Sequence, residues 1–210
     1  MAAQVPLYYR PGACALGPHI LLNLLGWTYD AIRALRDDSY KAINPTEAVP
    51  ALKFADDHVL TQAGAILRDL AEAAERTDLL RGKLARERAE VTRWTSFLTG
   101  DFHPAFFPVF VPERYTTDAS EASLAAAKQA GSVLVQTGLY EMQSQIAGRT
   151  HFIGNERTIV DAYAVPMLRW ANIALSNGLD NWLVTAQFCA DICADEGVVA
   201  AMRTQGMESA

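Results

Sequence analysis

The sequence predicts an α+β protein in which a small domain with a mixed sheet precedes an all-helical domain. Strand and helix signals alternate over the first third of the chain, in the order strand, helix, strand, then two strands and a helix. The two later strands flank an acidic turn and form an antiparallel hairpin, so the sheet must be mixed. Beyond Gly82 no further strand signal appears. We expect the boundary at residues 75–83 and domains at 1–77 and 84–210.

The elements of the first domain follow from apolar runs and the residues that interrupt them. Pro11 and Gly12 end the first strand, and apolar residues then recur at helical spacing. A polar stretch leads to the turn signal Asn44-Pro45, and Thr61 is expected to cap the helix after the hairpin. The expected elements are, in order, strand Val5–Tyr9, helix Cys14–Leu25, strand Trp27–Leu35, hairpin strands Ala48–Phe54 and His58–Leu60, and a helix whose core face is Ala63, Ile66, Leu67 and Leu70.

The second domain is predicted to be helical throughout. Three prolines in residues 103–112 must kink or end the first long helix. Thr158 and Asp161 stand in the capping-box arrangement, with Asp in place of Glu, and this predicts the start of a helix. The expected helices are 84–98, 120–145, the one that begins after Thr158, 179–194 and 197–202.

The composition is that of an ordinary globular protein. Of 210 residues, 50% are hydrophobic and 20% are charged, which is enough apolar material for a full core. A net charge of −6 argues against a broad surface for nucleic acid or for an anionic membrane. No apolar run approaches the roughly 20 residues that cross a bilayer, and the N-terminus lacks the layout of a signal peptide. We therefore expect a cytoplasmic protein without nucleic-acid or membrane partners.

The three cysteines bear on compartment and on reactivity. An odd number without a framework spacing indicates a reducing compartment. Cys14 lies where the first strand gives way to a helix, whose N–H groups and positive dipole end would stabilise a thiolate. The alternative is a small buried hydrophobe, and this stretch alone does not decide between the two. Cys189 and Cys193 share one face of a helix, where buried packing is favoured over a metal site.

Several short motifs occur in an order that is more specific than any one of them. They are Tyr9-x-Pro11-Gly12-Ala13-Cys14-x-Leu16-x-Pro18-His19-Ile20, Asn44-Pro45 followed by Val49-Pro50-Ala51-Leu52, Leu60-Thr61, His103 before Phe106, Thr158-Ile159-Val160-Asp161-Ala162-Tyr163, and Arg203-x-x-Gly206. In these motifs the chain resembles the glutathione S-transferase superfamily, and most of all its bacterial beta class, over essentially its whole length. The resemblance implies a thioredoxin-like first domain, a homodimer, and glutathione as co-substrate without a metal.

The resemblance also implies roles for individual residues. Cys14 would be the active-site cysteine, and His103 its partner across the domain cleft, able to accept the thiol proton. Val49, at the entrance to a cis-proline loop at Pro50, would pair its backbone with glutathione as an added strand does. The other glutathione-binding residues would be Tyr9, Gln62 and Ala63, and a hydrophobic electrophile would lie against Phe106, Phe107, Phe110, Tyr115 and Trp170.

The sequence departs from the family pattern where the γ-glutamyl group would bind. The family has Glu followed by Ser or Gly where this chain has Gln62 and Ala63, so a carboxylate for the ligand's ammonium group is missing. The helix N-terminus at that point still suits a carboxylate, whereas Glu47 adds negative charge near an anionic ligand. A hydrogen bond to a charged group is worth about 1.5–3 kcal/mol, so these changes are expected to weaken glutathione binding by one or two orders of magnitude.

Three functions are open from the sequence. The first is a glutathione transferase that conjugates glutathione to hydrophobic electrophiles in detoxification, or exchanges thiol and disulfide through Cys14. The second is a non-catalytic binding or scaffold protein with weakened glutathione affinity. The third is a glutathione-independent thiol enzyme, which requires a low pKa for Cys14. The presence of Cys14, His103 and the proline loop favours the first, and the changes at Glu47, Gln62 and Ala63 favour the second.

Overall fold

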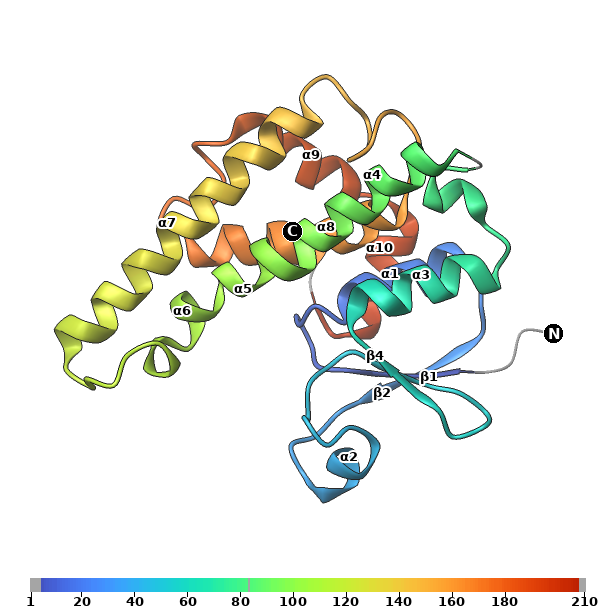
Figure 1. Ribbon diagram of the computed structural model, residues 1–210, viewed down its shortest axis with the longest axis horizontal. Helices are drawn as coiled ribbons and strands as arrows, with labels where there is room; N and C mark the ends of the chain where they lie inside the picture. Colours follow the sequence, from blue (N-terminus) through green and yellow to red (C-terminus); the bar gives the residue numbers. More distant parts are fainter. Residues whose placement is uncertain (1–4, 83, 208–210) are drawn as a thin grey trace.

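A computed structural model describes residues 5–82 and 84–207. Its sheet has four strands in the order β2-β1-β3-β4 (Figure 1). These are β1 (Val5–Tyr9), β2 (Tyr29–Arg33), β3 (Ala51–Lys53) and β4 (Val59–Thr61). β2 runs parallel to β1, whereas β3 is antiparallel to β1 and β4 is antiparallel to β3. The sheet is therefore mixed, as predicted.

Two helices cover the face of the sheet that turns toward the rest of the molecule. α1 (Leu16–Leu24) and α3 (Ala63–Ala73) pack against each other and separate the sheet from the helical half (Figure 1). Both helices bury the apolar faces that the sequence predicts, including Ile66, Leu67 and Leu70 of α3.

α2 (Asp38–Ile43) is a helix where the sequence predicts only a polar connection and a turn. Asp37 caps it by accepting the backbone N–H of Tyr40 at 3.1 Å. Tyr40 is the buried residue of this helix, and its ring lies against that of Tyr8 in β1. With a single buried position there is no apolar period to detect, so the cap and the tertiary contact determine this helix.

The remainder of the described chain is helical, as predicted. Its elements are a 3₁₀ turn η1 (Thr77–Leu80), α4 (Ala85–Ser96), a π-helical stretch η2 (Phe97–Phe102), α5 (His103–Ala105), α6 (Phe107–Phe110), a 3₁₀ turn η3 (Pro112–Arg114), α7 (Glu121–Ile146), α8 (Ile159–Ala174), α9 (Leu183–Cys193) and α10 (Glu196–Thr204). The proline-rich stretch is broken into short helical pieces, because proline lacks the N–H that a continuous helix needs. α7 extends away from the sheet (Figure 1).

α8 is the helix on which the two halves of the molecule meet. Every residue from Ile159 to Leu168 is buried. The predicted capping box is present, and Asp161 accepts the backbone N–H groups of Thr158 and Phe152, each at 2.7 Å. α1 lies directly on α8, since a Cβ atom at Gly17 would come within 2.9 Å of the Tyr163 ring. This close approach fixes Tyr163 relative to the loop that precedes α1.

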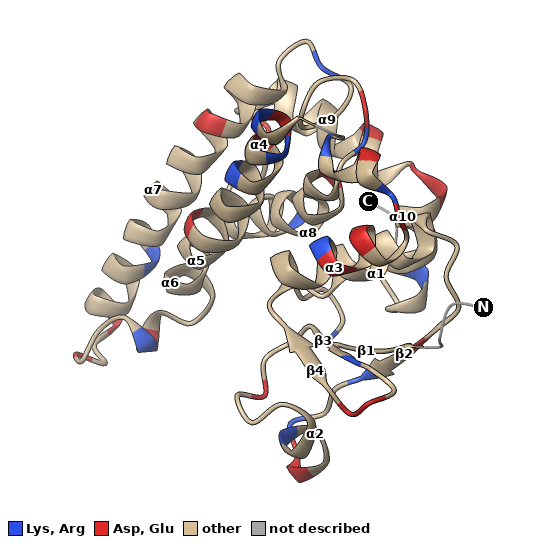
Figure 2. Ribbon diagram, turned by 45° about the vertical axis from the view of Figure 1, so that its right-hand side comes forward, with Lys and Arg blue, Asp and Glu red and all other residues tan. Residues whose placement is uncertain are grey.

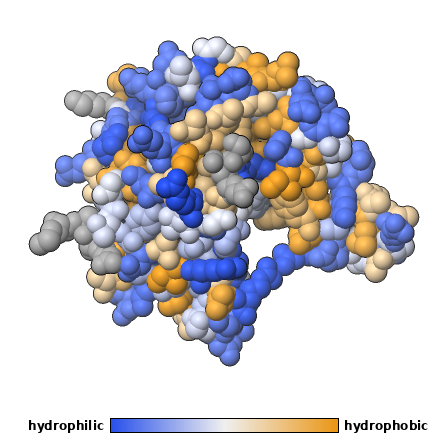
Figure 3. Space-filling view, turned by 180° about the vertical axis from the view of Figure 1, so that it is seen from behind, coloured by the Kyte–Doolittle hydropathy of each residue, from blue (hydrophilic) through white to orange (hydrophobic). Residues whose placement is uncertain are grey.

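The surface agrees with the modest net charge. Lys and Arg are interleaved with Asp and Glu over several helices (Figure 2). Seen from behind, the molecule shows hydrophilic and hydrophobic patches in alternation (Figure 3). Within residues 5–82 and 84–207, no helix combines the length and the apolar character that crossing a membrane requires.

Candidate functional site

A cavity of about 330 Å³ lies where the loops before α1 and β3 meet the starts of α3 and α5. It is lined by Cys14, Asn44, Thr46, Ala48, Val49, Pro50, Thr61, Gln62, Ala63, Thr99, His103, Pro104, Phe107 and Tyr163. All of the glutathione-binding residues expected from the sequence line this cavity except Tyr9. Tyr9 is buried elsewhere, and its hydroxyl donates to the carbonyl of Thr204 at 3.4 Å.

Cys14 lies in the loop between β1 and α1, two residues before the helix begins. Its thiol donates to the carbonyl oxygen of Val49, with sulfur and oxygen 3.3 Å apart. The hydroxyl of Tyr163 and the backbone N–H groups of Cys14 and Ala15 also form hydrogen bonds with the sulfur. The thiol is therefore held between the proline loop and α8.

The pKa of Cys14 is raised, not lowered. Burial raises it to about 11, and the hydrogen bonds from Tyr163 and from the start of α1 offset only part of that effect. For the protein without ligand, the raised pKa favours the second interpretation of Cys14, a buried thiol, over a thiolate stabilised by the helix N-terminus. The dipole of a helix contributes at most a modest stabilisation, whereas a residue that is only 6% exposed loses most of the hydration that a thiolate needs.

His103 begins α5 and reaches the cavity as a neutral side chain. Burial lowers its pKa to about 4. Its Nδ1 atom lies 2.8 Å from the hydroxyl oxygen of Tyr163, and its ring meets those of Phe107 and Trp170 at centroid distances of 5.1 and 4.9 Å. Since the Tyr163 hydroxyl donates its one hydrogen to the Cys14 sulfur, a neutral imidazole with its hydrogen on Nδ1 donates to the tyrosine oxygen. His103 thus brings a neutral hydrogen-bonding group to the cavity and no positive charge.

Tyr163 connects the thiol to the imidazole. Its hydroxyl forms hydrogen bonds with both Cys14 and His103. The sequence did not predict this role, although Tyr163 is the last residue of the motif that begins at Thr158. The only signal available was that motif, because the contact depends on α1 lying against α8 at Gly17.

The proline loop is ordered by side chains that bond to its backbone. The side-chain amide of Asn44 donates to the carbonyl of Ala48 at 2.8 Å, and its oxygen accepts the hydroxyl of Thr46 at 3.0 Å. The peptide bond between Val49 and Pro50 is cis, as the resemblance implies. The Val49 carbonyl faces Cys14 as a result of this loop path.

The start of α3 presents uncapped backbone to the cavity. Thr61 is the last residue of β4, so the prediction that it caps α3 is wrong, and Gln62 is the N-cap residue. Gln62 has a φ of 70°, in a region that residues other than glycine seldom adopt, and its side chain makes no capping hydrogen bond. The first N–H groups of α3 are therefore left without a side-chain cap beside the cavity, an arrangement that suits an anionic group.

The aromatic residues expected to form one wall are divided among different surroundings. Phe106 is fully buried and packs edge-on against Trp170, whose indole N–H donates to the carbonyl of Gly12 at 2.7 Å. Phe110 packs against the same indole and is 41% exposed. Phe107 is the aromatic residue of the expected wall that lines the Cys14 cavity.

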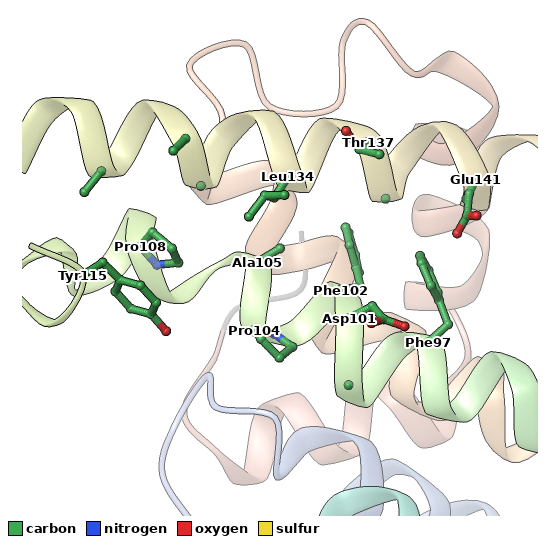
Figure 4. A pocket seen from close by; sticks show the side chains of 15 residues that line it. Phe97, Asp101, Phe102, Pro104, Ala105, Pro108, Tyr115, Leu134, Thr137 and Glu141 are labelled. Carbon is green, nitrogen blue, oxygen red and sulfur yellow. The ribbon is translucent and has the colours of Figure 1, made fainter.

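Tyr115 lies in a different hollow. This groove of about 710 Å³ runs between α7 and the segment from Phe97 to Tyr115. Figure 4 shows Tyr115 at one end of the groove and Glu141 of α7 at the other. The expected grouping of Tyr115 with Trp170 is therefore not formed within this chain. Within the part of the chain that the structure describes, no group of three or more His, Cys, Asp or Glu side chains could hold a metal ion.

Known proteins resemble the chain in sequence and in structure, although no protein-family model matches it. The glutathione S-transferase GST-4.5 of Xanthomonas campestris pv. campestris is 33% identical over 207 residues, which are 96% of this chain and 98% of that protein. A glutathione S-transferase structure from Xylella fastidiosa has a TM-score of 0.88 at 31% identity, covering 98% of this chain and 100% of its own. A bacterial beta class glutathione S-transferase of Sphingomonas chungbukensis has a TM-score of 0.84 at 28% identity, covering 97% and 100%.

Proposed function

Because the chain belongs to the glutathione S-transferase family and resembles its beta class, we propose that it binds glutathione beside Cys14 and transfers it to hydrophobic electrophiles or exchanges it through a mixed disulfide. The observation that carries this proposal is that Cys14, the proline loop, the start of α3 and His103 surround one cavity. The same proposal rests on the family for four further properties. They are domains at 1–77 and 84–210, pairing as a homodimer, a cytoplasmic location and a role in detoxification.

The cavity offers glutathione a backbone site and an anion site. Val49 stands just before β3, so an extended tripeptide beside it would pair with the chain as an added strand does. The γ-glutamyl carboxylate would meet the uncapped N–H groups at the start of α3, next to Gln62 and Ala63. The cysteinyl sulfur would then lie toward Cys14 and His103.

The protonated Cys14 would act first as a hydrogen-bond donor to the glutathione sulfur. With a pKa of about 11 it keeps its proton at neutral pH, and a donor beside the ligand stabilises the glutathione thiolate that attacks an electrophile. In exchange with glutathione disulfide, the Cys14 sulfur attacks one sulfur, the S–S bond breaks and a Cys14–glutathione disulfide forms. The Cys14 proton is lost to solvent, and the released glutathione sulfur takes up a proton from solvent.

A second candidate is a non-catalytic binding protein with weak glutathione affinity. The observation that favours it is the amide of Gln62 at the N-cap of α3, where the family has a carboxylate, followed by Ala63 without a hydroxyl. The third function, a glutathione-independent thiol enzyme, requires a low pKa for Cys14. The raised pKa of this thiol argues against it.

Calorimetric titration of glutathione into the full chain tests the proposal, with conjugation of glutathione to an aryl halide measured on the same samples. We expect binding by the wild type and by the matched control Cys189→Ala, whose thiol lies outside the cavity. We expect Cys14→Ala to bind up to about tenfold more weakly, since it loses one hydrogen bond of about 1.5 kcal/mol to a charged sulfur. A wild type without binding heat at millimolar glutathione would contradict the proposal, whereas binding without conjugation or disulfide exchange would select the second candidate.

A further inference from the structure

A second group of thiols lies away from the glutathione cavity, between α8 and α9. Cys189 and Cys193 of α9 line a separate cavity of about 260 Å³ together with Arg169 of α8. Cys193 is buried, Cys189 is partly exposed, and neither forms a disulfide. The sequence predicts ordinary packing for these two cysteines. In the structure, their thiols and one guanidinium group line a cavity.

The three side chains form a connected polar cluster. The thiols of Cys189 and Cys193 share a hydrogen bond, and Arg169 also donates to the Cys193 sulfur. The Nε and Nη1 atoms of Arg169 are buried and have no hydrogen-bond partner among the described residues. Since a buried donor is costly to leave unpaired, these N–H groups favour an oxygen-bearing guest in the cavity.

The electrostatics of the cluster favour a thiolate at one of the two sulfurs. The pKa of Cys193 is lowered, chiefly by the hydrogen bond from Cys189 and further by Arg169, although burial acts in the opposite direction. The ionisable groups around this cavity are Arg169 from α8, Asp180 from the connection to α9, and the two thiols. Arg169 is the cation of this set, and it lies within hydrogen-bond reach of the Cys193 sulfur.

We propose that Cys193 is a second reactive thiol, which hydrogen peroxide oxidises to a sulfenic acid in the cavity formed with Arg169 and Cys189. The Cys193 thiolate attacks one peroxide oxygen, an S–O bond forms and the O–O bond breaks. The sulfur loses two electrons, and the released hydroxide takes the proton that the thiol gave up, forming water. The free N–H groups of Arg169 hold the peroxide and then the sulfenate oxygen, while Cys189 donates its hydrogen bond to the reacting sulfur.

The size of the cavity fits a small oxidant. A water molecule occupies about 30 Å³ in the liquid, and hydrogen peroxide is only slightly larger, so a space of about 260 Å³ admits it. Cys193 is nevertheless only 5% exposed, so bulky thiol reagents are expected to reach its sulfur slowly. Selectivity for a small peroxide follows from this combination of a thiolate and a buried residue.

The test uses the full chain carrying Cys14→Ser, so that Cys189 and Cys193 are the thiols left to compare. The protein is treated with hydrogen peroxide and a 1,3-dione probe that captures sulfenic acids, and the labelled peptides are quantified by mass spectrometry. We expect label on Cys193, and a rate at least tenfold lower in Arg169→Gln. We expect Arg169→Lys, which keeps the positive charge, to recover part of the rate, and the exposed control Arg149→Gln to change nothing.

Two results would overturn the proposal. One is equal labelling of Cys189 and Cys193, and the other is an undiminished rate in Arg169→Gln. If Arg169→Gln fails to fold, Cys189→Ala decides, because it removes the hydrogen bond to Cys193 without altering the charge. Loss of the free Cys193 thiol to peroxide, which counts sulfenic acid and disulfide alike, should then slow several-fold, and an unchanged rate of loss in Cys189→Ala would reject the cluster as the cause of reactivity.

Discussion

Two buried cysteines of this protein contact the same helix, α8, yet differ in acidity. Cys14 is 6% exposed and Cys193 is 5% exposed, so their burial is nearly equal. Cys14 meets the neutral hydroxyl of Tyr163, and burial raises its pKa to about 11. Cys193 meets another thiol and the guanidinium of Arg169, and these partners lower its pKa. The chemical nature of the partner decides the outcome, because the effect of burial acts in the same direction at both sites.

The two thiols are suited to different chemistry. Cys14 keeps its proton at neutral pH, which suits the proposed role as a hydrogen-bond donor to bound glutathione. Cys193 carries its activating charge within the protein, which suits direct oxidation. Tyr163 and Arg169 both belong to α8, so changes along this one helix should affect the two thiols unequally.

The largest expected effect comes from Asp161→Ala, at the end of α8 nearer Tyr163. Asp161 is buried and accepts the backbone N–H groups of Thr158 and Phe152. Leaving two buried donors unpaired costs about 1–3 kcal/mol each, so the free energy of unfolding should fall by roughly 3 kcal/mol or more. Urea unfolding measures this loss, and the alkylation rate of Cys14 should change more than that of Cys193.

Asp118→Ala is the matched control for this change. Asp118 also accepts a backbone N–H, that of Ser120 at 2.9 Å, but it is exposed. Water replaces a lost partner at an exposed site, so we expect a loss below about 1 kcal/mol. Equal losses in the two variants would mean that the capping box does not anchor α8.

A somewhat smaller effect is expected when Cys14→Ala and the wild type are compared for how their free energy of unfolding falls at alkaline pH. The folded-state pKa of Cys14 is about 11 against 9.0 for the unperturbed thiol, so the unfolded state loses its proton first as pH rises. The stability that this group contributes is full below about pH 9 and is lost as pH rises through about 11, amounting to roughly 2–3 kcal/mol. Urea unfolding at several pH values should therefore show a shallower alkaline decline in Cys14→Ala than in the wild type. A slope that Cys14→Ala leaves unchanged would contradict the raised pKa.

Local patterns predicted most of the fold because they record which face of each element is buried. The hairpin around β3 and β4, the buried face of α3 and the capping box at Thr158 all follow from residues close together in the chain. α2 could not be found this way, since Tyr40 alone is buried in it. Gln62 replaced Thr61 as the N-cap because no local rule marks a glutamine for a φ of 70°.

The candidate site was predictable only where an ordered motif marks it. Cys14, His103 and the proline loop were found through the order of motifs, and the structure places them around one cavity. Tyr163 and Arg169 were not found, because each acts through a contact between elements that are distant in sequence. The direction of the Cys14 pKa shift depends on how completely the sulfur is buried, which its neighbours in sequence do not determine.

The smallest expected effect is that of Tyr163→Phe on the alkylation rates of Cys14 and Cys193, measured in one sample. This variant also tests the difference between the two thiols most sharply. The Tyr163 hydroxyl lowers the pKa of Cys14 through a hydrogen bond, so its loss should raise that pKa further. A net hydrogen bond of about 0.5–1.5 kcal/mol corresponds to a fall of up to roughly tenfold in the rate of Cys14 alkylation by iodoacetamide. Cys193 contacts Arg169 instead, so its rate should stay unchanged and serve as the internal control. If both rates fell together, the variant would have disturbed α8 as a whole, and if the Cys14 rate rose, the hydroxyl would be shielding the thiol instead of stabilising its thiolate.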